Sequence, residues 1–183
     1  MELKINEKHR LALHPDEFAD TIYDITPELL EIWKIKVLIC DIDNTLVPYD
    51  VPSADENLIE HLKNIEKSGV KIAFVSNNNK ERVDLFNEPF GFFANEKSGK
   101  PFGKGIRKCI KHFGVDKKQI VLVGDQLFTD VLGAHDAGIK AILVPPIKEK
   151  ENTFFKIKRM AEKPFLKYYK RKRMKEFKKQ IIE

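Results

Sequence analysis

The sequence predicts an α/β fold, a doubly wound, Rossmann-like parallel sheet with helices on both faces. Short apolar runs rich in Val and Ile have the composition of strands buried on both faces. Helical patterns lie between these runs, and alternation of strands with helices of this length is typical of a parallel sheet. The predicted strands span residues 36–42, 70–75, 120–123 and 139–144.

The first helix is predicted within DENLIEHLKNIEKSG. Leu58, Leu62 and Ile65 recur at spacings of four and three, which places them on one face of a helix. Asp55 is a suitable N-cap and Gly69 a suitable stop signal.

Two more helices are predicted further along the chain. In KPFGKGIRKCIKHFG, Ile106, Ile110 and Phe113 again share one face, and Gly114 ends the pattern. QLFTDVLGAHDAG predicts a short helix that ends at Gly138.

The flanking segments divide the chain into three predicted parts. Residues 1–35 form a helical lead-in, in which 15–33 reads as two short helices, the second capped by Thr26. Residues 36–147 form the α/β core. Pro145 and Pro146 break its pattern, so residues 148–183 are predicted to be a separate C-terminal extension.

The extension carries the basic character of the protein. It holds 14 Lys/Arg against 5 Asp/Glu, whereas the whole chain has a net charge of only +5. Residues 163–179 combine nine basic residues and one acid with aromatic side chains. Such a segment suits an anionic membrane surface and, as a less favoured partner, RNA. The alternative without a partner is a solvated helix that packs on the domain.

The rest of the composition indicates a cytoplasmic protein, either free or peripheral at a membrane surface. The start of the chain shows no apolar stretch of signal-peptide length, and no segment approaches the roughly 20 apolar residues of a membrane span. Cys40 and Cys109 lack disulfide or metal-ligand spacing, so we expect two small buried apolar side chains.

Polar residues follow the predicted strands directly, where parallel sheets bind their ligands. Three carboxylates at one sheet edge repel each other unless a cation lies among them. Mg²⁺ prefers such oxygen ligands, and hydroxyl, amide and lysine donors suit a phosphoryl group. The candidate residues are Asp41, Asp43 and Thr45 after the first strand, Ser76 and Asn77 after the second, Asp125 and Asp130 after the third, and Lys100 before a helix.

These stretches resemble the four motifs of the haloacid dehalogenase-like superfamily. D-I-D-N-T-L follows one strand, S-N the next, K-P precedes a helix, and G-D-Q-L-F-T-D follows another strand, over about residues 36–145. The chain also resembles the YqeG-like branch of this superfamily, in HPDEFADTIYDITPELL and GDQLFTDVLGAHDAG. That branch is related to the mitochondrial phosphatidylglycerophosphatase.

The resemblance implies a role for each catalytic position. Asp41 would be the nucleophile that forms an aspartyl-phosphate and would also bind Mg²⁺. Asp43 would act first as general acid and then as general base, and its main-chain carbonyl would bind the metal. Lys100 would neutralise the nucleophile and the phosphate.

The remaining positions would bind phosphate or metal. Ser76 and the main-chain N–H of Asn77 would hold phosphoryl oxygens, although both residues could instead cap the next helix. Thr45 would support the loop and could touch phosphate. Asp125 would ligate the metal directly, and Asp130 directly or through water.

The spacing of the motifs also implies an uncapped core. Asp43 and Ser76 are only 33 positions apart, and Ser76 and Lys100 are 24 positions apart, which leaves no room for an inserted specificity domain. The sequence therefore predicts a Mg²⁺-dependent phosphomonoester phosphatase with an open site. The favoured substrate is a phospholipid phosphate such as phosphatidylglycerophosphate; the alternatives are a soluble nucleotide or sugar phosphate, or an RNA- or protein-binding module that uses the basic extension.

Overall fold

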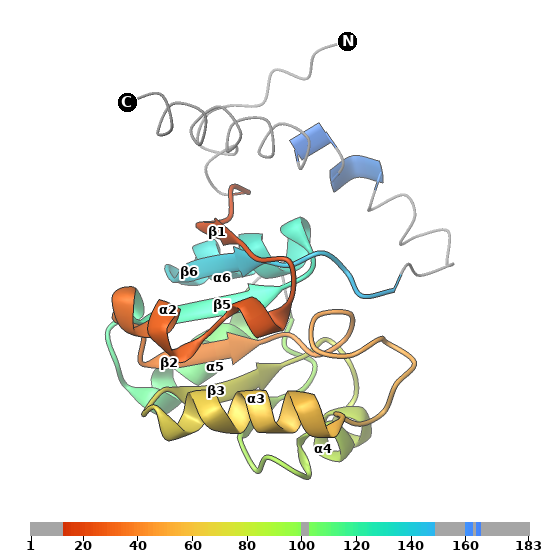
Figure 1. Ribbon diagram of the computed structural model, residues 1–183. Helices are drawn as coiled ribbons and strands as arrows, with labels where there is room; N and C mark the ends of the chain where they lie inside the picture. Colours follow the sequence, from red (N-terminus) through yellow and green to blue (C-terminus); the bar gives the residue numbers. More distant parts are fainter. Residues whose placement is uncertain (1–12, 100–102, 149–159, 163, 166–183) are drawn as a thin grey trace, which may run out of the picture. The chain divides into compact units, whose positions relative to one another are not determined.

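The structure is a computed structural model that describes residues 13–99, 103–148, 160–162 and 164–165 (Figure 1). The chain separates into two compact units, residues 1–148 and 149–183. Every strand among the described residues, and the described part of the candidate site, belong to the first unit. In the second, the described residues 160–162 and 164–165 are helical.

The first unit is built on a six-stranded sheet in which every paired strand is parallel. Its spatial order is β1-β6-β5-β2-β3-β4. This architecture confirms the predicted α/β class. The strands are β1 (Glu17–Phe18), β2 (Val37–Cys40), β3 (Lys71–Val75), β4 (Phe93–Asn95), β5 (Ile120–Gly124) and β6 (Lys140–Leu143).

Helices cover both faces of the sheet. In Figure 1, α2 and α3 lie in front of the strands and α5 and α6 lie behind them. The helices are α2 (Pro27–Ile32), α3 (Glu56–Lys67), α4 (Lys80–Asn87), α5 (Lys104–Phe113) and α6 (Leu132–Ala137). Short turns of other helical types are η1 (Ile22–Asp24), η2 (Lys117–Gln119) and η3 (Leu127–Val131).

The predicted helix signals operate as expected at α3 and α6. The Asp55 side chain accepts a hydrogen bond from Leu58 N at 2.8 Å, and Leu58, Leu62 and Ile65 are buried. At the end of α6, Gly138 adopts a φ of +80°, the left-handed conformation that glycine accommodates without strain.

The segment before β2 contains two short helices, as predicted: the 3-10 helix η1 and α2. The second is capped by Thr26, whose side chain accepts from Leu29 N. The sequence did not predict the short strand β1 before them, which forms because Asp16 N and Ala19 N donate to Ala141 O and Leu143 O along the edge of β6. A sheet edge that offers hydrogen bonds can therefore add a strand that the local pattern does not show.

Among the described residues, no inserted domain covers the carboxyl ends of the strands. A loop and α3 alone connect β2 to β3, and α4 and β4 follow β3. Side chains of α3, α4 and the central strands share one apolar cluster that includes Leu62, Phe74 and Phe86. No helix among the described residues is long and apolar enough to span a bilayer.

Candidate active site

A sharp turn follows β2 and carries the first candidate residue. Asp41 N donates to Val123 O at 3.0 Å, which extends the pairing with β5 by one residue, and Asp41 is buried. The chain then folds back on Ile42, whose carbonyl accepts from the N–H groups of Thr45, Leu46 and Val47. The turn requires a φ of +69° at Asn44, a conformation that asparagine tolerates better than most residues.

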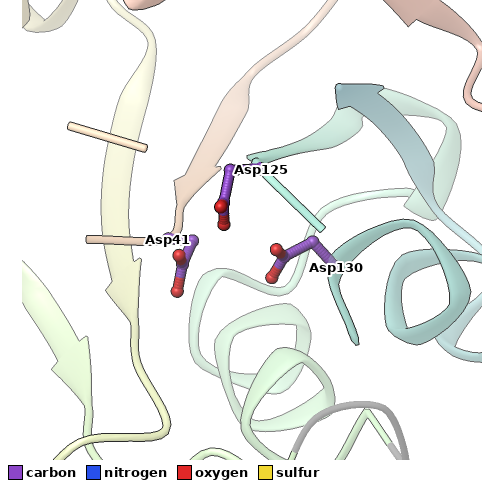
Figure 2. Close-up of side chains that lie close together, drawn as sticks. All are labelled: Asp41, Asp125 and Asp130. Carbon is purple, nitrogen blue, oxygen red and sulfur yellow. The ribbon is translucent and has the colours of Figure 1, made fainter. Parts of the chain in front are cut away.

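Asp41, Asp125 and Asp130 converge at the carboxyl ends of β2 and β5. One carboxylate oxygen from each lies within 4.8 Å of the others, and all three residues are 5 % exposed or less. Figure 2 shows the three side chains directed toward one shared space. Three hard oxygen donors in this arrangement fit a small divalent cation such as Mg²⁺.

Asp130 can approach the other two carboxylates because residue 124 is a glycine. Gly124 was not one of the predicted site residues. A Cβ on Gly124 would lie 2.3 Å from Asp130 Cγ, closer than real Cβ contacts allow. The turn η3 then places Asp130 so that its carboxylate accepts from Gln126 N at 3.0 Å. Gly124 thus makes the space that brings Asp130 to the other two carboxylates.

Thr45 lies beside Asp41. Its hydroxyl is buried and donates to Asp41 Oδ2 at 3.3 Å. This contact agrees with a supporting role in the loop, because it restricts the rotation of the Asp41 carboxylate.

Asp43 lies on the other side of the site, among hydrogen-bond donors. Its Oδ1 accepts from Arg82 Nη2 at 3.1 Å, and its Oδ2 accepts from Ser76 Oγ and Asn78 Nδ2, each at 3.3 Å. The Asp43 and Arg82 side chains are 14 % and 13 % exposed. Neither Arg82 nor Asn78 was predicted from the sequence. Their only signal was their position shortly after the S-N motif.

Ser76 and Asn77 follow β3 as predicted, but they do not cap α4. The N-cap is Asn79, whose side chain accepts from Arg82 N at 3.0 Å. The capping alternative for Ser76 and Asn77 is therefore wrong. Asn77 Oδ1 instead accepts from Ser98 Oγ at 2.9 Å, which joins the β3 loop to the loop after β4.

Lys100 lies outside the described residues, so its predicted contact with the nucleophile stays a prediction. The described residues on either side connect to the site region through the backbone. Ser98 N donates to Ser76 O at 2.9 Å, and Gly105 N donates to Ser98 O at 2.7 Å.

The two cysteines are buried thiols, as predicted. Burial, reinforced by the negative charge of Asp41, raises the pKa of Cys40 far above its ordinary range. Burial likewise raises the pKa of Cys109 to about 12. Both side chains remain protonated at neutral pH and act as apolar packing groups. The His112 ring stacks on Phe93, and His135 Nε2 lies 3.1 Å from Asp16 Oδ2.

Comparison with known families gives a match over most of the chain. The haloacid dehalogenase-like hydrolase family matches residues 4–144. "Probable phosphatase YqeG" of Bacillus subtilis is 41 % identical over 158 residues, which cover 86 % of this chain and 92 % of that protein. A glyceraldehyde 3-phosphate phosphatase of Pyrococcus abyssi is 28 % identical over 110 residues, 54 % of this chain and 44 % of that enzyme.

Solved structures share the fold. An uncharacterized protein of Listeria monocytogenes serotype 4b superposes with a TM-score of 0.51 at 22 % identity, covering 64 % of this chain and 85 % of that one. CbbY of Rhodobacter sphaeroides, solved in complex with phosphate, has a TM-score of 0.50 at 13 % identity, covering 66 % and 90 % of the two chains.

Proposed function

Because the chain belongs to the haloacid dehalogenase-like hydrolase family and is a phosphatase of that family, we propose that it hydrolyses phosphomonoesters through an aspartyl-phosphate on Asp41. The observation that carries the proposal is the convergence of Asp41, Asp125 and Asp130 within 4.8 Å. A phosphoryl group beside this cluster would be positioned for in-line attack by Asp41.

The proposed cofactor is Mg²⁺, held by the side chains of Asp41, Asp125 and Asp130 and by the main-chain carbonyl of Asp43. The buried carboxylates supply the oxygen donors that this ion prefers. When bound, the ion would offset the negative charge of the phosphoryl oxygens and of the carboxylates around them.

The two aspartates of the first motif divide the chemistry. Asp41 attacks phosphorus, and the bond from phosphorus to the leaving oxygen breaks as Asp43 donates a proton to that oxygen. Asp43 then takes a proton from water, the water oxygen attacks phosphorus, and the bond to Asp41 breaks. Inorganic phosphate and free Asp41 are the products.

The other predicted residues bind the transferring group. Ser76 Oγ and the main-chain N–H of Asn77 would donate to the phosphoryl oxygens, and Lys100 would add a positive charge. Support for Ser76 comes from its position beside Asp43, 3.3 Å away. Thr45 would keep Asp41 oriented, with a secondary contact to phosphate.

Hydrolysis of p-nitrophenyl phosphate tests the activity. The wild type should turn over with Mg²⁺, lose activity with EDTA and regain it when Mg²⁺ is restored. Asp41→Asn should be inactive. Asp136→Asn is the matched control, because Asp136 is about half exposed and pairs with Arg107 at the surface. Wild-type protein that binds RNA in a salt-dependent manner but shows no turnover would support the binding-module alternative.

For the substrate we propose a phospholipid phosphate such as phosphatidylglycerophosphate. Support comes from the basic, aromatic residues 163–179, most of which lie outside the described residues, because such a segment suits anionic lipid headgroups. An apolar hollow of about 580 Å³ beside the loop of Thr45 and Val47 would accept an apolar part of a substrate.

A small soluble phosphate ester is the second candidate. The observation that favours it is the similarity to a glyceraldehyde 3-phosphate phosphatase over about half of this chain. A nucleotide or sugar phosphate belongs to the same class of substrate.

A comparison of vesicle-bound and soluble substrates separates these candidates. Phosphatidylglycerophosphate in anionic vesicles should be hydrolysed faster than glyceraldehyde 3-phosphate or nucleotides. Changing Lys170, Arg171, Lys172 and Arg173 together to Gln should remove this advantage. In the control variant, four exposed lysines of the core are changed to Gln, and the advantage of the vesicle-bound substrate should remain. These are Lys63, Lys67, Lys108 and Lys111. Faster turnover of a soluble ester by both variants and the wild type would contradict the lipid proposal.

A further inference from the structure

Arg82 joins three segments of the chain around Asp43. Its Nη2 donates to Asp43 Oδ1 at 3.1 Å and to Val51 O at 2.8 Å, and its Nη1 donates to Pro52 O at 2.8 Å. The planar guanidinium group has a fixed geometry, so three acceptors at these distances define its orientation.

The backbone of Arg82 is held as firmly as its side chain. Arg82 lies in the first turn of α4, where its N–H donates to the N-cap side chain of Asn79 at 3.0 Å. Its guanidinium carbon also lies 5.7 Å from the centre of the Phe86 ring, which is fully buried in the core. The guanidinium group that faces Asp43 is therefore held by α4 and by the core residue Phe86.

Asp43, in contrast, lies on the turn after β2, where rotation about its side-chain bonds would move the carboxylate out of the site. Ser76 and Asn78 donate hydrogen bonds to Oδ2 of Asp43, and Arg82 donates the one to Oδ1. Ser76 is also the residue proposed to bind phosphate. If Ser76 turns to the substrate, Arg82 and Asn78 keep Asp43 in place.

We propose that Arg82 is a positioning residue, which holds the Asp43 carboxylate in the orientation needed to protonate the leaving oxygen and to activate water. This inference rests on the proposed function. It concerns a residue outside the four motifs, and it differs from a purely structural role because its effect must pass through Asp43.

The dependence on the leaving group tests the proposal. An alkyl alcohol leaves poorly unless it is protonated, whereas p-nitrophenolate leaves readily without an acid. The quantity to compare is kcat/KM, which reports formation of the phosphoenzyme, the first irreversible step. Arg82→Gln should lower kcat/KM for an alkyl phosphate such as glycerol 3-phosphate roughly 10- to 100-fold, but by less than about threefold for p-nitrophenyl phosphate.

The ratio of the two kcat/KM values does not depend on how much of a variant is folded, so it is informative even if Arg82→Gln loses stability. Arg82→Lys keeps the charge but not the fork of donors and should give an intermediate ratio. Guanidinium ion should restore part of the alkyl phosphate activity of Arg82→Ala. Arg107→Gln is the control, since Arg107 is about half exposed and pairs with Asp136.

A double-mutant cycle tests whether Arg82 acts through Asp43. For p-nitrophenyl phosphate, kcat should be limited by hydrolysis of the phosphoenzyme, and Arg82→Gln should lower it in the wild type but not further in Asp43→Asn. Equal losses of kcat/KM on both esters, or additive losses of kcat in the double variant, would overturn the assignment of Arg82. Neither result would contradict the proposed phosphatase activity. A wild type that hydrolyses neither of these esters, nor phosphatidylglycerophosphate in anionic vesicles, would overturn both proposals.

Discussion

Asp41 and Asp43 are separated by one residue in sequence but lie in different surroundings. Asp41 lies with two other buried carboxylates, Asp125 and Asp130, in a group that fits a cation. Asp43 lies among donors, of which Arg82 carries a positive charge. The turn after β2 separates the two side chains. In the proposed mechanism, this one short segment presents one carboxylate to the metal and the other to the leaving group.

Changing each aspartate to asparagine should have the largest effect and should separate the two roles. Asp41→Asn should reduce turnover by more than roughly 10³-fold, because no nucleophile remains. Asp43→Asn should reduce kcat by about 10²- to 10⁴-fold, the usual contribution of acid–base catalysis. Rapid quenching after mixing with labelled substrate should detect the phosphoenzyme in Asp43→Asn but not in Asp41→Asn. Accumulation in Asp41→Asn would contradict the assignment of the nucleophile.

Mg²⁺ binding at the acidic cluster should weaken when a residue of that cluster is changed and Asp43 is kept. Asp125→Asn removes one charge from the buried cluster and should raise the Mg²⁺ concentration for half-maximal activity by tenfold or more, on the order seen for lost metal-site interactions. Calorimetric titration of Mg²⁺ measures the same loss without turnover. Arg82→Gln, on the other side of the site, should leave Mg²⁺ affinity within about twofold. Equal effects of the two changes would mean that the two regions do not act separately.

Gly124→Ala should disturb the acidic cluster without removing any carboxylate. The added Cβ would meet Asp130 Cγ at 2.3 Å, so the Asp130 side chain or β5 must move. We expect a loss of about 1–3 kcal/mol in the free energy of unfolding, together with weaker Mg²⁺ binding. Urea denaturation and calorimetry measure the two effects.

Gly91→Ala is the control for this change. Gly91 has a φ of +64° and nothing within 4 Å of an added Cβ. It should lose roughly 1 kcal/mol of stability through backbone strain but keep normal Mg²⁺ affinity. A similar loss of affinity in both variants would remove the specific role of Gly124.

The smallest expected effect concerns a carboxylate remote from the site. Partial burial of Asp16 opposes its ionisation, but hydrogen bonds from His135 and Ala141 outweigh this and hold its pKa below the ordinary 3.8. Ionised Asp16 therefore stabilises the fold above pH 3.8, and this contribution is lost as the pH falls through the lowered pKa.

Asp16→Asn should cost less than about 1 kcal/mol at neutral pH, because the side chain is 40 % exposed. Melting temperatures of the variant and the wild type should converge as the pH falls below 3.8, and catalysis at neutral pH should not change. Asp20→Asn, at an exposed position nearby, is the control. A stability difference that persists at low pH would show that the effect of Asp16 is not one of charge.

The sequence predicted the central strands and the helices with clear caps because their signals are local. Val37–Cys40 is a continuous apolar run, and Asp55 and Gly138 mark the two kinds of helix end. The edge strands β1 and β4 were missed. They are two and three residues long and only partly buried, so no apolar run announces them, and they form because a neighbouring strand offers its hydrogen bonds.

The candidate site residues could be selected from the sequence, but their surroundings could not be predicted from it. Motif spacing placed Asp41, Asp43 and Ser76 at strand ends, since a parallel sheet brings those ends to one edge. Arg82 could not be recognised in this way, because its contact with Asp43 joins residues 39 positions apart.

The sequence by itself determined the α/β class and the acidic character of the strand ends, because alternating apolar runs and the residues that follow them are local properties of the chain. The tertiary structure alone decided which carboxylates share one space. Asp130 reaches Asp41 only through the gap at Gly124 and the turn η3, while Asp43 is turned toward Arg82. Such distances depend on how β2, β5 and α4 pack together, and packing joins residues that are far apart in the chain.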